Sequence, residues 1–225
     1  MRSLLSILQF RDLESAIQLQ ENLSQHLSLT WDDRPIRTIA GVDMRDRGNT
    51  INAAIAVFRY PELIQLTTVT GVAPPGCRYV PGLLAFRIGP AILDAWKKLQ
   101  QAPDLIMVHG HGIAHPRGLG LASHLGLWLN LPAIGVARTR LLGNHPEVGP
   151  NAGDWSELRD EETGERVIGA VLRTRTGIQP VFISPGHLID LPHSIQFVLA
   201  ICRTYRIPEP IRTAHNAAAR ASLHS

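Results

Sequence analysis

The strongest constraint on the fold is a change of hydrophobic pattern near Pro35. Before it, the segment from about Asp12 to Leu29 carries apolar residues at helical spacing, which predicts an N-terminal helix. After it come three runs rich in β-branched and small apolar residues, separated by short turn-forming segments. These runs are residues 36–44, 51–60 and 63–73. Three short strands joined by short turns predict an antiparallel meander.

The second half of the chain alternates between strand-like and helix-like segments. We expect helices at 90–100, with Pro90 in the first turn, at 120–130 and, closing the domain, at 194–205. Strands are expected at 104–110, 133–138, 165–174 and 180–186. Strand-helix-strand alternation favours parallel pairing. The predicted class is therefore α/β, with a mixed sheet whose first three strands are antiparallel and whose later strands are parallel, flanked by helices.

Length and composition fit one soluble domain spanning residues 1–225. The 44% hydrophobic content is that of a globular protein, and no linker or repeat divides the chain. No apolar stretch approaches the roughly 18 residues of a membrane span, and charged residues arrive too early for a secretory signal. We expect a cytoplasmic monomer without a membrane partner. The two cysteines, Cys77 and Cys202, suggest neither a disulfide framework nor a zinc finger.

The positive charge is almost wholly arginine. Lys97 and Lys98 are the only lysines, and the net charge is +3. The arginine fork suits bidentate phosphate contacts, but so small an excess is weak evidence for a nucleic-acid partner.

Three features carry candidate chemistry. Asp43 ends the first predicted strand, where a carboxylate can face a metal or a substrate, although such an Asp is more often a turn former or helix cap. Tyr79 precedes a tight turn at Pro81 and Gly82, so it could stack on a base or close the core. Residues 109–126 follow a predicted strand with four histidines, one arginine and several glycines. Such a loop suits close approach of a phosphate, although the glycines could serve packing and one or two histidines could be core residues. The density of these residues favours the functional interpretation.

Six blocks of sequence, in this order, resemble the endonuclease V family. They are AGVD, YVPGLLAFR, GHGIAHPRGLGLASHLG, PAIGVAR, SPGH and YRIPEPIRTAH, between about residues 39 and 215. The resemblance implies a ribonuclease H-like fold and recognition of inosine in DNA, or in RNA. It also implies magnesium-dependent hydrolysis of a phosphodiester one nucleotide beyond the deaminated base, on its 3′ side.

The same resemblance implies roles for individual residues. The family's base wedge corresponds to residues 78–82, with Tyr79 as the wedge beside Pro81 and Gly82. Contacts to the lesion and the backbone come from the glycine-rich loop, here Gly112, His115, Arg117 and Gly120. A histidine near the active site corresponds to His215.

The catalytic positions depart from the family pattern. Family members hold the metal with an Asp on the first strand, a Glu after the wedge loop and an Asp that opens the glycine-rich motif. Here these positions hold Asp43, Ile88 and His109, and Arg138 stands where the family has a lysine. Isoleucine offers no ligand, and imidazole suits transition metals better than magnesium. We therefore expect weak or absent cleavage with magnesium.

Three interpretations follow from the sequence. The first is a working nuclease whose site is rebuilt by Asp46, His109 or His111, around manganese or another transition metal. The second is a pseudo-nuclease that binds inosine-containing or distorted nucleic acid without cutting it. The third, ranked last, is a metal site formed by His109, His111 and His115.

Overall fold

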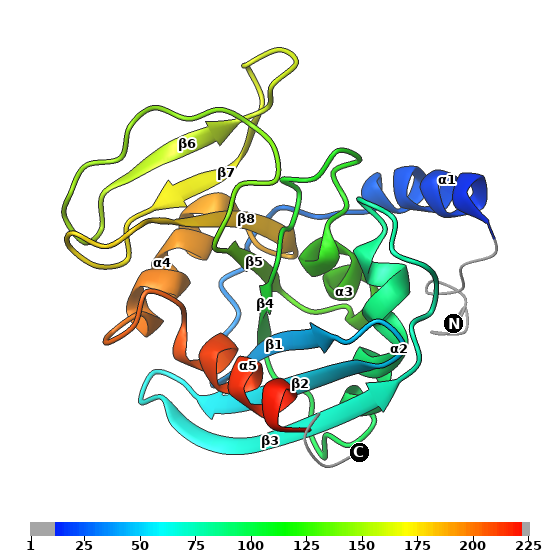
Figure 1. Cartoon of the computed structure of the whole chain (residues 1–225). Coiled ribbons are helices and arrows are strands. Elements are labelled where there is room, and N and C mark those ends of the chain that lie inside the picture. The colour runs from blue at the N-terminus through cyan, green and yellow to red at the C-terminus, as the bar shows by residue number, and fades with distance from the viewer. Residues whose placement is uncertain (1–11, 222–225) are drawn as a thin grey trace.

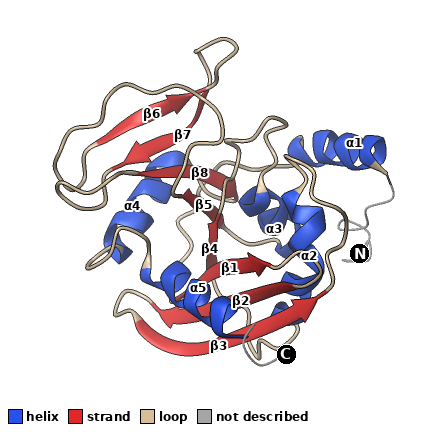
Figure 2. Cartoon of the chain, in the orientation of Figure 1, coloured by secondary structure: helices blue, strands red, loops and turns tan. Residues whose placement is uncertain are grey.

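A computed structural model describes residues 12–221 (Figure 1). One eight-stranded sheet runs through the molecule, in the order β3-β2-β1-β4-β5-β8-β7-β6 (Figure 2). Its strands are β1 (Thr38–Asp46), β2 (Ile51–Arg59), β3 (Ile64–Ala73), β4 (Leu105–His109), β5 (Ala133–Ala137), β6 (Trp155–Arg159), β7 (Val167–Leu172) and β8 (Val181–His187). The helices are α1 (Leu13–Ser24), α2 (Leu84–Trp96), α3 (Leu121–Leu129), α4 (Leu191–Ile201) and α5 (Glu209–Ala221).

The first three strands form the predicted antiparallel meander. β4 then joins β1 in parallel, and β5 joins β4 in parallel, as the strand-helix-strand alternation predicts. The parallel region ends there, because β8, β7 and β6 add to β5 in antiparallel pairs. The mixed α/β sheet is therefore confirmed, while the expectation of parallel later strands holds only for β4 and β5.

Helices cover both faces of the sheet. One face carries α2 and α3, whose apolar residues share a buried cluster with residues of β1, β2, β4 and β5. The other face carries α4 and α5, which pack on the opposite side chains of the same strands. The hairpin of β6 and β7 projects beyond these helices at the upper left of Figure 1. No helix among residues 12–221 is long and apolar enough to cross a membrane.

Two helical predictions differ from the structure. α2 begins at Leu84 rather than at Pro90, which lies inside the helix. The Arg87 carbonyl accepts a hydrogen bond from the Gly76 amide at 2.9 Å, so the preceding loop packs against the turn that contains the proline. The predicted closing helix is α4, but a further helix, α5, follows it and was not predicted. Strand β6 was not predicted either.

Candidate active site

Asp43 and His109 are brought together by the parallel pairing of β1 and β4. Val42 pairs with Val108 in this register, so the next residue of each strand lies beside the other. The His109 Nδ1 atom lies 3.0 Å from Asp43 Oδ2. Asp43 does not end its strand as the sequence suggested, because β1 continues to Asp46 in its pairing with β2.

His215 reaches the same carboxylate from α5. Its Nδ1 atom lies 2.8 Å from Asp43 Oδ2. The helix can approach this closely because residue 41 is a glycine: a Cβ atom on Gly41 would lie 2.0 Å from the Pro210 carbonyl carbon. The glycine of the AGVD block thus permits α5 to pack on β1, and this packing places His215 at the site.

These three residues form a compact group of possible ligands. One ligand atom from each of Asp43, His109 and His215 lies within 4.8 Å of the others. The Asp43 side chain is 2% exposed, whereas those of His109 and His215 are 24% and 31% exposed. The group is therefore buried on the carboxylate side and open on the imidazole side.

Asp46 is not part of this group. Its carboxylate binds the Arg87 guanidinium, with Oδ2 2.5 Å from Nε and Oδ1 3.0 Å from Nη2. The Arg87 hydrogen bonds lower the pKa of Asp46. Because both oxygens are occupied by a buried arginine, the expectation that Asp46 supplies a substitute ligand is wrong for this conformation.

Ile88 follows Arg87 in α2, and its side chain lies in the apolar interior. It is 0% exposed and belongs to the cluster that α2 forms with the sheet. Its side chain therefore packs the core and offers no donor to an ion.

The three-histidine interpretation is also not supported by the structure. His111 Nε2 lies 3.1 Å from the Thr139 carbonyl oxygen, and His115 Nε2 lies 3.0 Å from the Gly82 carbonyl oxygen. Among the residues that the structure describes, the one group of three or more possible metal ligands contains His109 but neither of these two.

The wedge loop presents Tyr79 to solvent. The Tyr79 residue is 66% exposed, so it does not close the core. Pro81 and Gly82 form the turn that follows, and Gly82 has a φ of 79°, a left-handed conformation that favours glycine. The tight turn expected from the sequence is therefore present, and the aromatic ring stands free of the interior.

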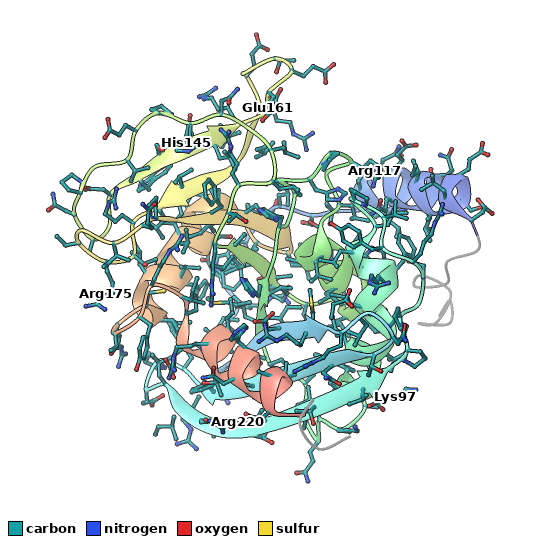
Figure 3. The ribbon with its side chains drawn as sticks, in the orientation of Figure 1. Lys97, Arg117, His145, Glu161, Arg175 and Arg220 are labelled. Atoms are coloured by element: carbon teal, nitrogen blue, oxygen red, sulfur yellow. The ribbon has the colours of Figure 1, made fainter. Side chains whose placement is uncertain are left out.

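A single carbonyl oxygen anchors this loop. The Gly82 oxygen accepts hydrogen bonds from Gln20 Nε2 at 3.0 Å, His115 Nε2 at 3.0 Å and Arg117 Nη2 at 2.9 Å. Arg117 also donates from Nε to Gln20 Oε1 at 2.6 Å. Two of the residues assigned to nucleic-acid contact, His115 and Arg117, thus join the glycine-rich loop to the wedge loop and to α1. Figure 3 shows Arg117 beside α1.

His115 is held in one neutral tautomer. Its Nε2 atom donates to Gly82, and its Nδ1 atom accepts from the Arg117 amide at 3.3 Å. Burial, with the Arg117 charge, lowers the pKa of His115 to about 4. Burial lowers the pKa of His111 as well. His124 is 0% exposed and packs edge-on against Phe86. The interpretation of one or two of these histidines as core residues is therefore correct for His115 and His124.

Two glycines of this loop serve close packing. A Cβ atom on Gly112 would lie 2.0 Å from the Pro185 carbonyl oxygen, and one on Gly120 would lie 2.4 Å from that of His111. The Gly112 amide also donates to Ser184 Oγ at 2.7 Å. Packing therefore explains both glycines, whereas their sequence pattern favoured close approach of a phosphate.

A pocket of about 150 Å³ lies between the wedge loop and the glycine-rich loop. Its lining includes Tyr79, Gly82, Leu84, Gly110 and Leu141. Gly110 directly follows His109, so the pocket adjoins the Asp43 group along the chain. Exposed Tyr79 and mainly apolar walls give a recess suited to a flat, partly apolar ring.

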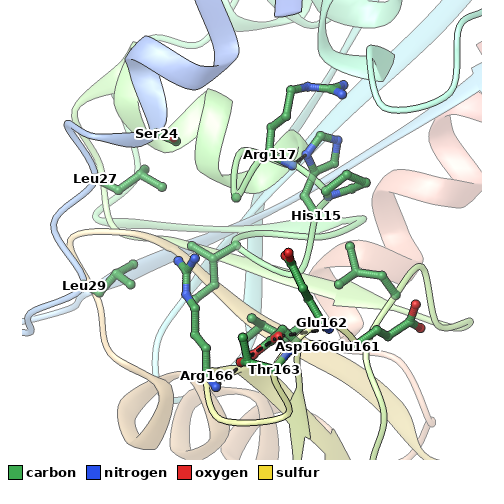
Figure 4. Close-up of a pocket in the computed structure, with 15 residues that line it drawn as sticks. Ser24, Leu27, Leu29, His115, Arg117, Asp160, Glu161, Glu162, Thr163 and Arg166 are labelled. Atoms are coloured by element: carbon green, nitrogen blue, oxygen red, sulfur yellow. Dashed lines mark hydrogen bonds between the residues drawn. The ribbon is translucent and has the colours of Figure 1, made fainter.

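A larger cavity, about 780 Å³, lies elsewhere in the described part of the chain. Figure 4 shows it between the segment after α1, which carries Leu27 and Leu29, and the β6–β7 turn with Asp160, Glu161 and Glu162. None of Asp43, His109 and His215 lines it. Its lining combines three carboxylates with Arg117 and Arg166, so its size alone does not make it the better site.

Arg138 is exposed just beyond β5, the strand that pairs with β4. Its carbonyl oxygen accepts from Arg206 Nη2 at 3.0 Å. Burial, with the neighbouring Arg138 charge, lowers the pKa of Arg206. The two arginines make this edge of the site basic.

The fold and the site define a ribonuclease H-like α/β protein with a carboxylate-histidine group at the ends of adjacent parallel strands. The family model for endonuclease V matches residues 17–216. The chain belongs to the endonuclease V family.

Relatives of known name agree with this membership. Endonuclease V of Trichormus variabilis is 47% identical over 206 residues, which cover 90% of this chain and 91% of the relative. The crystal structure of endonuclease V from Streptomyces avermitilis has a TM-score of 0.89 at 36% identity, covering 96% and 95% of the two chains. A Ciona intestinalis endonuclease V variant, solved with a 23mer DNA containing an inosine, has a TM-score of 0.80 at 25% identity, covering 94% and 98%.

Some residues of the site were not predicted from the sequence. Gln20 is 1% exposed and bonds both to Gly82 and to Arg117, yet it sits in an ordinary amphipathic helix. The sequence did contain one signal for it, because a polar residue stands there on the apolar face of the predicted helix. Leu84 and Leu141 line the pocket without any motif to mark them.

Proposed function

We propose that this protein recognises inosine in nucleic acid and takes the deaminated base into the pocket between the wedge loop and the glycine-rich loop. The observation that carries the proposal is exposed Tyr79 at the mouth of that pocket, on a loop fixed by three hydrogen bonds to Gly82. Enzymes that act at a base often extrude it into such a recess and stack it on an aromatic ring. The inosine-containing DNA in the Ciona intestinalis relative supports the same substrate class.

In this proposal Arg117, His115, Gly112 and Gly120 position the recognition loops, while Tyr79, Pro81 and Gly82 meet the base. Asp43, His109 and His215 lie where the phosphodiester would be hydrolysed, on the 3′ side of the inosine. Arg138 contributes positive charge beside them. The whole chain acts as one endonuclease V-like domain, because a single sheet joins its described parts.

The residues at the candidate catalytic group differ from those that usually bind magnesium. Magnesium takes oxygen ligands in nearly octahedral geometry. The group offers one carboxylate and two imidazoles, Ile88 is buried in the core, and Asp46 is bound to Arg87. These residues do not fit magnesium. We therefore propose inosine binding with weak or absent cleavage in magnesium, as in a pseudo-nuclease.

A transition-metal-dependent nuclease is the second candidate, and the convergence of His109 and His215 on Asp43 favours it. One experiment separates the two. A labelled duplex with one deoxyinosine is titrated for binding in EDTA and assayed for nicking in magnesium, manganese, zinc or cobalt, with Asp43→Ala as control.

Tight binding that depends on inosine, with no nicking in any metal, identifies the pseudo-nuclease. Nicking in a transition metal that Asp43→Ala abolishes identifies the nuclease. Equal affinity for inosine and control duplexes would refute the proposed recognition, and an RNA duplex in the same assay reports the preferred nucleic acid.

A further inference from the structure

The most informative group for a further role is the same Asp43, His109 and His215 cluster, considered as a ligand set in its own right. Its members come from β1, the end of β4 and α5. Three elements that are far apart in the sequence thus bring one oxygen and two nitrogen atoms within 4.8 Å of one another. Such convergence of buried and half-buried ligand atoms is the geometry of a cation site.

The separations within the group suit an ion of about 2 Å bond length. Ligands bound at roughly 2.0–2.2 Å lie about 3.0–3.5 Å apart in octahedral or tetrahedral geometry. Asp43 Oδ2 lies 3.0 Å from His109 Nδ1 and 2.8 Å from His215 Nδ1. Both distances are close to these values, and one nitrogen of each imidazole lies within 4.8 Å of the other.

The carboxylate is oriented for this task by the backbone. Asp43 Oδ1 accepts the Met44 amide hydrogen at 2.7 Å. The other oxygen, Oδ2, then faces both imidazoles. A hydrogen bond that fixes one carboxylate oxygen while the other binds a metal is a common supporting contact of metal sites.

The donor set selects the kind of ion. Imidazole nitrogen suits zinc, copper, nickel and iron, whereas carboxylate, carbonyl and water oxygens suit magnesium, calcium and manganese. With two nitrogen ligands and one oxygen ligand, this site favours the ions that suit imidazole. Three protein ligands also leave positions open for water or a phosphate oxygen, as in catalytic rather than structural zinc sites.

We propose that Asp43, His109 and His215 bind a divalent transition-metal ion of the zinc and cobalt type in preference to magnesium and manganese. The identity of this ion as a cofactor for hydrolysis rests on the second function proposed above, the transition-metal-dependent nuclease. The binding site itself depends only on the geometry of the three side chains.

The test uses Co²⁺ alone, added to the metal-free full chain, with visible absorption and calorimetry as readouts. We expect one ion per chain with nitrogen-ligand absorption, and displacement of Co²⁺ by Zn²⁺ but not by millimolar Mg²⁺. His215→Ala and His109→Ala should each weaken Co²⁺ binding at least about tenfold, because even the loss of an outer-shell partner commonly costs 10- to 100-fold. His26→Ala, which removes an exposed imidazole outside the group, should leave it unchanged.

A Co²⁺ spectrum and affinity that are the same in wild type and in folded His215→Ala would overturn the proposal. Should the variants fail to fold, thermal unfolding of the wild type provides the check, since an ion that binds only the native state raises Tm. Zn²⁺ should raise Tm at micromolar concentration while Mg²⁺ does not, and equal effects of the two ions would contradict the site. Inosine-duplex binding in EDTA tests the recognition pocket without any metal, so either proposal can fail while the other stands.

Discussion

Asp43 and His215 lie 172 positions apart in the sequence, yet the carboxylate Oδ2 and imidazole Nδ1 atoms are 2.8 Å apart. The contact depends on Gly41, which lets α5 approach the backbone of β1. It also gives the site its third ligand atom, since Asp43 and His109 alone would be a poor cation site. The packing of α5 on β1 therefore determines which ligand atoms surround Asp43.

His109→Asp should move metal preference towards magnesium. The change replaces a borderline nitrogen donor with a hard oxygen and adds a negative charge beside Asp43. We expect stronger Mg²⁺ binding, weaker Zn²⁺ binding and a gain of nicking in magnesium, measured by calorimetry and by the deoxyinosine duplex assay. His109→Asn, which has similar size but no charge, is the control. An unchanged ratio of Zn²⁺ to Mg²⁺ affinity in His109→Asp would contradict the role given to His109.

Ile88→Ala should destabilise the protein by about 2–5 kcal/mol, the usual cost of deleting most of a buried isoleucine side chain. Ile88 is fully buried in the cluster between α2 and the sheet. Chemical denaturation measures the change, and Ile88→Val should cost only about 0.5–1.5 kcal/mol. Metal-free inosine binding should persist in the folded fraction of both variants. A negligible loss of stability in Ile88→Ala would show that the side chain does not pack as described.

Tyr79→Ala should weaken binding to the deoxyinosine duplex without unfolding the protein. The ring is mostly exposed, so its loss costs little core packing. Stacking of an aromatic on a base contributes about 1–3 kcal/mol, which corresponds to roughly 5- to 150-fold in Kd. Tyr79→Phe should retain most of the affinity. Tyr205→Ala, at another exposed tyrosine, is the matched control, and an equal effect of both alanine variants would exclude a specific wedge role.

The sequence predicted the turn after Tyr79 and named all three members of the Asp43 group, but it did not predict the contacts around that group. Tyr79, Pro81 and Gly82 form the expected turn, because proline and a left-handed glycine specify it locally. The pairing of Asp46 with Arg87 and the burial of Ile88 depend on how α2 packs against β1, which local patterns do not reveal. Helix α5 does carry a helical pattern, since its buried residues Ile211, Ala214 and Ala218 recur at helical spacing, but only tertiary packing places it on β1.

Arg117 makes contacts within the protein that its motif does not reveal. The family resemblance implies a contact of Arg117 with the lesion or the nucleic-acid backbone, and in the structure its guanidinium donates to Gln20 and Gly82 within the protein. Arg117→Gln should therefore weaken inosine binding through loss of loop position. If Arg117 instead contacts a phosphate, its replacement would also reduce the slope of log K against log salt by about 1.

We expect that slope to stay unchanged in Arg117→Gln, measured by binding titrations between low and physiological salt. Gln20→Leu should reproduce the loss of affinity, because it removes the acceptor that holds the Arg117 side chain and a donor to Gly82. A slope reduced by about one in Arg117→Gln, with Gln20→Leu unaffected, would instead assign Arg117 to the nucleic-acid backbone.

Acid should destabilise the protein through His115. The pKa of this imidazole falls from 6.5 to about 4 in the folded state, chiefly because it is buried. The unfolded chain therefore binds more protons between these values, so stability should decrease as pH falls from about 6.5 to about 4. The shift corresponds to at most about 3 kcal/mol. Denaturation midpoints across this range should fall less steeply in His115→Gln, which keeps an amide donor for Gly82 but does not titrate. The same dependence of stability on pH in wild type and His115→Gln would show that protonation of His115 does not cause the acid destabilisation.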